Sequence, residues 1–119
     1  MTRLSAKKTT PTAPAGVMAS QPWVCSGVLS ASAVVSDHPS LLGAVLLEID
    51  DTGQDSNVQV WDSATATTSG KECLGVFVAN DVAKQHSNLY AFPLPGVEAA
   101  EGLYLVVTAG DVKAFVYYR

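Results

Sequence analysis

Runs of alternating apolar and polar residues, separated by turn residues, recur from residue 23 to the end of the chain. In the clearest run, Val58, Val60 and Asp62 fall on one side of an extended backbone, and Gln59 and Trp61 fall on the other. A period of two is typical of a β-strand. Similar runs predict further strands over residues 23–30, 31–36, 40–50, 73–80, 88–93, 102–108 and 112–119.

The longest run, SLLGAVLLEID over residues 40–50, is compatible with two structures. Its leucines and alanine favour a helix, whereas its length and valine content allow a strand that is buried on both faces near its middle. Gly43 in the interior favours the strand, with a bulge at this position. No segment has the pattern of an amphipathic helix, although residues 81–87 suit either one helical turn or an irregular loop.

Turn residues separate the runs at short intervals. Asp37 and the proline that follows His38 predict a turn over residues 36–39. Polar segments predict a hairpin loop over 50–57, an exposed Ser/Thr-rich loop over 63–72 and a turn-rich crossing over 95–102. Seven or eight short strands spaced in this way indicate an antiparallel sandwich or barrel.

The closing segment, GLYLVVTAGDVKAFVYYR over residues 102–119, holds two alternating runs on either side of a tight turn. Gly110 suits the positive-φ position of a three-residue hairpin turn, so the two strands are expected to form a hairpin. The expected core residues are Leu103, Leu105 and Val107 on the first strand and Val112, Ala114 and Val116 on the second.

Large side chains occupy both sides of the last strand. Phe115 and Tyr117 point one way, and Val116 and Tyr118 point the other. This pattern predicts a strand that is covered on both faces. The core would cover one face, and an interface, in which tyrosine supplies a large rigid contact area, would cover the other. A half-exposed strand shielded by its tyrosines is the alternative.

Residues 1–22 differ from the rest of the chain. Their apolar residues follow neither the period of two of a strand nor the period of 3.6 of a helix, and they include three prolines. They predict a flexible arm, followed by one β-sandwich domain over residues 23–119. The arm carries Arg3, Lys7 and Lys8 and no acid, a charge of +3, whereas residues 23–119 hold four cations and eleven acids, a charge of −7. An acidic body argues against nucleic-acid binding, while the basic arm suits either an acidic protein surface or a solubilising role.

The composition points to a surface that a partner covers. Charged residues make up 15% of the chain, compared with about 25% in an average soluble domain. A small chain with so little charge is expected to bury apolar surface in an oligomer or larger assembly, although an ordinary β-domain rich in small residues has a similar composition. The longest apolar stretch, residues 41–47, is too short to span a membrane, and no apolar segment of a secretory signal follows the basic N-terminus.

Few residues suit catalysis or metal binding. His38 precedes a proline in a turn and His86 lies in a polar loop, and neither stands in a known nucleophile motif, so both are expected to be solvated. Several carboxylates surround the loop glycine of DDTGQD, as in calcium sites, but the spacing of an EF-hand is absent. We expect no catalytic residue, no metal and no cofactor.

The two cysteines, Cys25 and Cys73, lie in apolar strand-like runs and lack the spacing of a metal or redox motif. Two isolated cysteines of this kind are expected to be buried free thiols.

The closing segment resembles the closing motif of small structural proteins of tailed bacteriophage virions. The similarity extends over residues 23–119 and includes LLGAVLLE at 41–48 and VQVWDSATATTSGKE at 58–72, whereas residues 73–101 are longer than the loop of that family. The matching residues of the closing motif are Gly102, Leu103, Tyr104, Val106, Thr108, Val112, Val116, Tyr117 and Tyr118.

This resemblance implies an all-β protein: an antiparallel, jelly-roll-like β-sandwich of seven to eight strands with an extended N-terminal arm. It implies a non-enzymatic capsid decoration or cement protein, made in the host cytoplasm and located on the exterior of the virion head. Such a protein is commonly a homotrimer and bridges major capsid protein subunits, with no membrane or nucleic-acid partner. The residues expected to act are Arg3, Lys7 and Lys8 in the capsid-binding arm, and Trp23, Trp61, Phe115 and Tyr117 in packing or the oligomer interface.

Two other functions remain open from the sequence. A β-sandwich module of a tail or fibre that recognises a host-surface glycan would need an exposed aromatic platform beside a carboxylate, such as Trp61 with Asp62. A small metal-dependent enzyme would need His38 or His86 to converge with Asp50 or Asp55.

Overall fold

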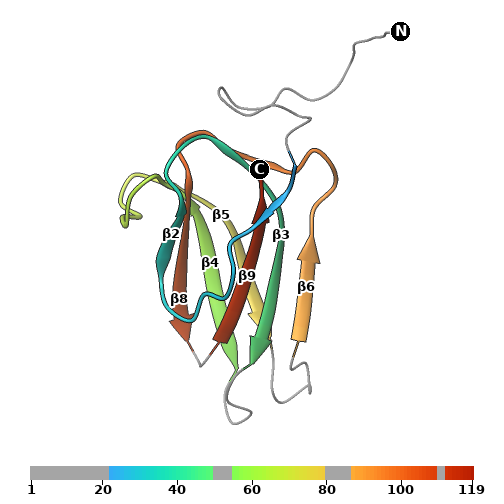
Figure 1. The fold of residues 1–119 in the computed structure, drawn as a ribbon. Helices are drawn as coiled ribbons and strands as arrows, with labels where there is room; N and C mark the ends of the chain where they lie inside the picture. Colours follow the sequence, from blue (N-terminus) through green and yellow to red (C-terminus); the bar gives the residue numbers. More distant parts are fainter. Residues whose placement is uncertain (1–21, 50–54, 80–86, 110–111) are drawn as a thin grey trace, which may run out of the picture.

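The part of the chain that the structure describes consists of strands, turns and loops, with no helix (Figure 1). The structure is a computed structural model, and it describes residues 22–49, 55–79, 87–109 and 112–119. Its strands are β1 (Val24–Cys25), β2 (Ala33–Ser36), β3 (Ser40–Ile49), β4 (Ser56–Asp62), β5 (Glu72–Ala79), β6 (Ser87–Ala91), β7 (Val97–Ala99), β8 (Leu103–Ala109) and β9 (Val112–Tyr118). The all-β prediction is confirmed.

The strands form two antiparallel sheets that pack face to face. Sheet A has the strand order β1-β9-β3-β6, with β7 also paired to β3, and sheet B has the order β2-β8-β4-β5. The core lies between the sheets because alternate residues of each strand point inward, as in the pattern of buried and half-buried residues along β4. It is built from Leu42, Val45, Leu47, Val58, Val60, Phe77, Ala79, Ala99, Leu103, Leu105, Val112, Ala114 and Val116.

The predicted strand and bulge at Gly43 are confirmed. The register of β3 against β9 shifts between Leu42 and Ala44, which pair with Tyr118 and Tyr117. The flat indole ring of Trp23 lies against the backbone of Gly43, so that a Cβ atom built there would stand 2.5 Å from the ring. Glycine is therefore needed at this position for close packing.

Three details of the predicted topology are wrong. The predicted hairpin loop over residues 50–57 does not join paired strands, because β3 lies in sheet A and β4 lies in sheet B. The predicted closing hairpin does not form, because β8 pairs with β2 and β4 in sheet B, whereas β9 pairs with β1 and β3 in sheet A. The connection from β8 to β9 therefore crosses from one sheet to the other, and the apolar inner faces of the two strands meet across the core. The predicted crossing over residues 95–102 also contains a short strand, β7, whose residues Val97–Ala99 pair with the start of β3.

Three aromatic side chains close one side of the sandwich, where β5 and β6 form the edges of the two sheets. Phe77 of β5 packs edge-on against Tyr90 of β6, at 5.2 Å between ring centroids, and against Phe92, at 6.0 Å. The Tyr90 hydroxyl donates to the carbonyl oxygen of Val78 at 2.6 Å and accepts from the Val78 amide at 3.3 Å. Asn88 donates to the same carbonyl at 3.2 Å. These bonds satisfy backbone groups on an edge strand that would otherwise attract another strand.

Replacing Tyr90 with phenylalanine is expected to lower the free energy of unfolding by about 1 kcal/mol, because the ring stays packed while the hydrogen bonds to Val78 are lost. Chemical denaturation measures this loss. Tyr104→Phe is the matched control, because Tyr104 lies half-buried on β8 of sheet B, away from this edge; its effect is expected to stay within about 0.5 kcal/mol. Equal losses in the two variants would contradict the role assigned to the Tyr90 hydroxyl.

A buried carboxylate binds the backbone at the end of sheet B where β4 ends and β8 begins. Asp62, at the end of β4, is 8% exposed. Its two oxygens accept from the backbone amides of Ala100 at 2.9 Å, Glu101 at 2.8 Å and Gly102 at 3.3 Å. The side chain thus holds the turn that precedes β8, and its three hydrogen bonds compensate for the cost of burying the charge.

Candidate functional site

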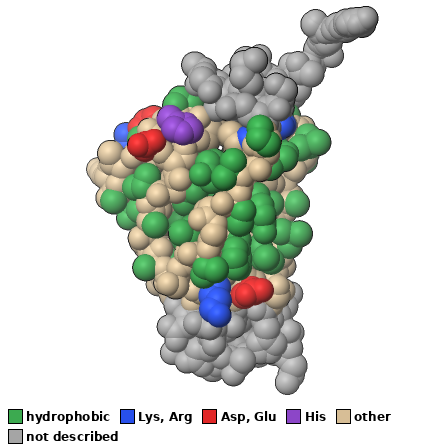
Figure 2. All heavy atoms as spheres, in the orientation of Figure 1, with side chains coloured by type: hydrophobic (Ala, Val, Ile, Leu, Met, Phe, Trp, Pro, Cys, Tyr) green, Lys and Arg blue, Asp and Glu red, His purple; other side chains and the backbone are tan. Residues whose placement is uncertain are grey.

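The outer surface of sheet A carries large apolar side chains. We define face A as Ala44 and Leu46 of β3, Leu89 and Ala91 of β6, and Phe115 and Tyr117 of β9. These residues alternate along their strands with buried or half-buried ones, so they point away from the core. Figure 2, which views the molecule from the side of β9, β3 and β6, shows hydrophobic side chains over these strands and charged side chains towards the two ends.

The strand register arranges face A in rows. Leu46 is paired with Leu89 on one side and Phe115 on the other, and Ala44 is likewise paired with Ala91 and Tyr117. The next row along, at Glu48, is polar, because Glu48 is paired with Ser87 and Lys113. Leu89, on the edge strand β6, is 59% exposed. Face A is therefore an uncovered apolar surface with a charged boundary at one end.

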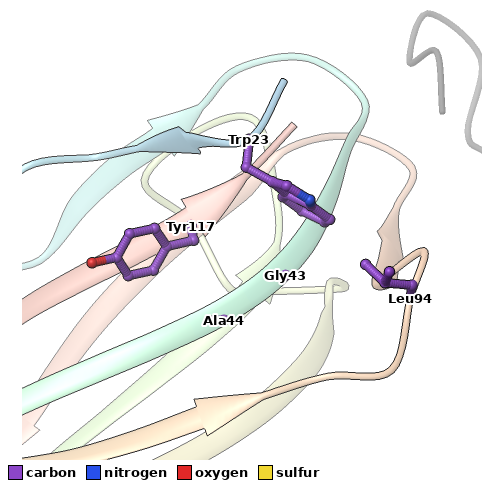
Figure 3. A pocket seen from close by; sticks show the side chains of 5 residues that line it. All are labelled: Trp23, Gly43, Ala44, Leu94 and Tyr117. Carbon is purple, nitrogen blue, oxygen red and sulfur yellow. The ribbon is translucent and has the colours of Figure 1, made fainter. Parts of the chain in front are cut away.

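A hollow overlaps one end of face A, where Trp23 lies over β3, and shares Ala44 and Tyr117 with it (Figure 3). Its volume is about 250 Å³, and it is lined by Trp23, Gly43, Ala44, Leu94 and Tyr117. Figure 3 shows Tyr117 and Leu94 on opposite sides of Trp23, with Gly43 and Ala44 beneath. Leu94 is 75% exposed and Trp23 is 37% exposed. The hollow is thus an apolar depression with two aromatic walls, and it is large enough for a few side chains rather than for a drug-sized ligand.

Two interactions hold the aromatic walls in place. The guanidinium carbon of Arg119 lies 4.2 Å from the centroid of the Trp23 ring, a cation–π contact. Tyr117 is paired with Cys25 of β1. Burial, and to a lesser extent the neighbouring Cys25 thiol, raise the pKa of the Tyr117 phenol above its ordinary value of 10.0. This shift favours the neutral form of the phenol, which suits an apolar contact surface.

The outer surface of sheet B is also without charge over its centre. In one row, Val34, Tyr104, Trp61 and Cys73 follow one another across β2, β8, β4 and β5. In the next row, Gln59 lies between Val106 and Val76. The Trp61 indole donates to the Gln59 side chain at 2.9 Å. The molecule therefore has two uncharged broad faces. Leu89 is the exposed large apolar side chain of face A, and Val34 and Val76 are exposed on the outer surface of sheet B.

The predicted packing or interface residues are divided between these two faces. Phe115 and Tyr117 lie on face A and Trp23 lies beside it, whereas Trp61 lies on the outer surface of sheet B. Sequence reasoning missed Leu46, Leu89 and Leu94. The alternation over residues 40–50 and 88–93 placed Leu46 and Leu89 on strands. Only the strand register shows that these two leucines are neighbours. The predicted arm residues Arg3, Lys7 and Lys8 lie outside the described residues.

The prediction that the cysteines are buried is wrong. Cys25 and Cys73 are free thiols, as expected, but both are exposed. Cys25 lies on β1, a two-residue edge strand, and Cys73 lies on the edge strand β5. An edge strand has a neighbour on one side only, so an apolar run at an edge does not ensure burial.

Among the described residues, those that suited other functions do not converge. His38 lies exposed in its turn, where its Nδ1 is 3.2 Å from the carbonyl oxygen of Pro39. His86, Asp50 and Asp51 lie outside the described residues. The carboxylate of Asp62 points inward to backbone amides and does not join Trp61 in a platform for a glycan. Within residues 22–49, 55–79, 87–109 and 112–119, no group of three His, Cys, Asp or Glu side chains could hold a metal, and no helix is long and apolar enough to cross a membrane.

No protein-family model matches this chain, and no match was found among curated proteins or solved structures. The fold alone does not define a function, because one β-sandwich architecture serves many functions. The function therefore has to be inferred from the surfaces of the molecule, and above all from face A and the hollow beside it.

Proposed function

We propose that this chain is a structural protein of a bacteriophage virion, a decoration or cement protein that binds the outer surface of the head and stabilises it by bridging major capsid protein subunits. The observation that carries the proposal is face A: two apolar rows across three strands, uncovered in the single chain. Contiguous exposed apolar surface on a small protein marks an interaction site. A protein repeated many times on a lattice has both its own copies and the shell to cover such a surface.

We also infer that the sandwich is a jelly roll. With the short strand β7 set aside, the orders β1-β9-β3-β6 and β2-β8-β4-β5 give two four-stranded sheets. Consecutive strands alternate between the sheets except for β4 and β5, which are neighbours in sheet B. Jelly rolls of eight strands recur in viral capsid domains and in lectins. This architecture favours the virion assignment, although the assignment rests on face A.

In the proposed mechanism, copies of the chain associate through face A around a symmetry axis, as a homotrimer. Arg3, Lys7 and Lys8 of the arm contact acidic surface on neighbouring capsid subunits. Each contact is weak, but once one copy is bound the remaining contacts form within the same complex, so the overall attachment is strong. No catalytic step and no cofactor is required for this function.

Introducing a charge on face A tests the proposal. Leu89→Asp is expected to raise the dissociation constant of self-association by about 30-fold, because burial of a leucine contributes about 2 kcal/mol to an interface. Analytical ultracentrifugation measures self-association, and co-sedimentation with expanded capsids of a tailed phage measures attachment. Leu89 is suited to the test because it is well exposed in the single chain.

Val76→Asp is the matched control, because Val76 is 54% exposed and lies on an outer strand surface of sheet B. Both variants place an aspartate at an exposed position of a strand. Any effect of that aspartate on folding is therefore common to both, and a difference in assembly between them reports on face A. The proposal requires weakened assembly and capsid binding for Leu89→Asp and near-normal behaviour for Val76→Asp. A wild-type chain that stays monomeric and does not bind capsids would refute it.

A further inference from the structure

The hollow beside face A and the sequence of the arm fit one another chemically. The hollow has aromatic walls from Trp23 and Tyr117 and an almost wholly apolar lining. Aromatic-lined depressions are the usual binding sites of proline-rich segments, because a polyproline II helix is extended, preformed and loses little entropy on binding. The arm contains such a segment, Pro11-Thr12-Ala13-Pro14.

The spacing of these prolines also matches the hollow. In a polyproline II helix, residues three apart return to the same side of the helix, about 9 Å along its axis. Tyr117 and Leu94 lie on either side of Trp23, so the hollow offers two apolar positions separated by one indole ring (Figure 3). One proline can contact Trp23 and Tyr117, and the other can contact Trp23 and Leu94.

The chain leads directly from this segment to the hollow, because eight residues, 15–22, separate Pro14 from Trp23. They extend over at most about 28 Å, which is enough for the chain to turn back on Trp23, and Gly16 provides a residue for the turn. The effective concentration of a segment tethered so closely is in the millimolar range, far above that of another copy in dilute solution. The arm carries +3 and residues 23–119 carry −7, so electrostatic attraction adds to the contact.

We propose that the hollow formed by Trp23, Gly43, Ala44, Leu94 and Tyr117 binds the Pro11–Pro14 segment of the same chain. The bound segment covers the exposed faces of Trp23 and Leu94 while Arg3, Lys7 and Lys8 extend beyond it. The hollow is thus a peptide-binding site of the polyproline type, with the arm as its occupant. This inference does not depend on the proposed virion function, since it concerns contacts within a single chain.

Quenching of Trp23 fluorescence by acrylamide tests the inference in the full-length chain. The background variant Trp61→Phe leaves Trp23 as the only tryptophan. Replacing both prolines, Pro11→Ala with Pro14→Ala, is expected to raise the quenching constant about twofold, because at a millimolar effective concentration a weak contact is about half occupied and the variant loses it. Circular dichroism confirms that the sandwich is folded in each variant.

Two further measurements separate the alternatives. The control Val17→Ser with Met18→Ser changes apolar residues of the arm outside the proline segment and is expected to leave quenching unchanged; if this control, rather than the proline variant, exposes Trp23, the assignment to the prolines is wrong. The protection of Trp23 is expected to be the same from low to high micromolar protein, with a monomeric mass at the low end. Protection that appears only as the protein concentration rises would mean that a second copy supplies the segment, and would overturn the proposal, as would equal quenching in all variants.

Discussion

Replacing Asp62 with alanine is expected to lower the free energy of unfolding by about 3 kcal/mol, because three backbone amides lose a charged acceptor in a buried place. The amides belong to Ala100, Glu101 and Gly102, which form the turn into β8. In a domain of this size the melting temperature is expected to fall by about 12 °C. Thermal and chemical denaturation, followed by circular dichroism, measure both quantities.

The variant Asp62→Asn separates the charge from the hydrogen bonds. Asparagine keeps one carbonyl oxygen, so it can accept from some of the amides, and about half of the loss is expected to be recovered. Glu98→Ala is the control for removing an acid at the surface, since Glu98 is exposed on β7, and its effect is expected to stay within about 0.5 kcal/mol. A loss for Asp62→Ala as small as that for Glu98→Ala would show that the carboxylate does not hold the turn.

Asp62 also shows what strand periodicity can and cannot predict. The alternation over 58–62 placed Asp62 on the same side as Val58 and Val60, and all three are buried. The pattern therefore predicted the direction of the side chain correctly. It did not predict the partners, because Ala100, Glu101 and Gly102 follow Asp62 by 38 to 40 residues. Only the pairing of β4 with β8 brings these segments together.

The closing strands show a second limit of the sequence. The core residues expected on β8 and β9 are buried, apart from Val107, which is half-buried. Their partners were predicted wrongly, because the alternation within a strand shows which side faces the core but not which strand lies beside it. A short connection with a glycine suits a hairpin within one sheet, and here it joins two sheets instead. Both arrangements bury the same side chains, so burial alone does not distinguish them.

The candidate site was also predictable only in part, because alternation shows which side of a strand a residue lies on but not which strand is its neighbour. The two-sided pattern of β9 predicted that Phe115 and Tyr117 would lie opposite the core, and the structure places them on face A. The other members of face A come from β3 and β6, so their neighbourhood depends on register. The hollow depends on the bulge at Gly43 and on Trp23 lying over it, an arrangement for which glycine in a strand was the only signal in the sequence.

Replacing Gly102 with alanine is expected to destabilise the domain by about 3 kcal/mol, at the upper end of the cost of overpacking a close-packed site. A Cβ atom at this position would contact the carbonyl oxygen of Ser36, and would lie 3.0 Å from both the Cα of Ala64 and the carbonyl oxygen of Ser63. All three contacts are with backbone, so no flexible side chain can move aside. Chemical denaturation of the variant measures the loss.

Gly70→Ala is the matched control for Gly102→Ala. Gly70 has a φ of 73°, and a Cβ atom added there would have nothing within 4 Å, so alanine meets only the backbone penalty of about 1 kcal/mol. If both variants lose the same stability, steric crowding at Gly102 is not the cause.

The two largest effects are expected to be coupled, because the amide of Gly102 donates to the carboxylate of Asp62 at 3.3 Å. Alanine at 102 must displace the turn from the backbone of Ser36 and Ser63, and this displacement pulls the amides of residues 100–102 away from Asp62. Once those hydrogen bonds are weakened, removing Asp62 costs less. The double variant Asp62→Ala with Gly102→Ala is therefore expected to lose about 1 kcal/mol less than the sum of the single losses, within the range found for residues in contact. Strict additivity would mean that the turn accommodates the methyl group without moving, and that close packing at Gly102 and the anchoring of the turn by Asp62 are independent.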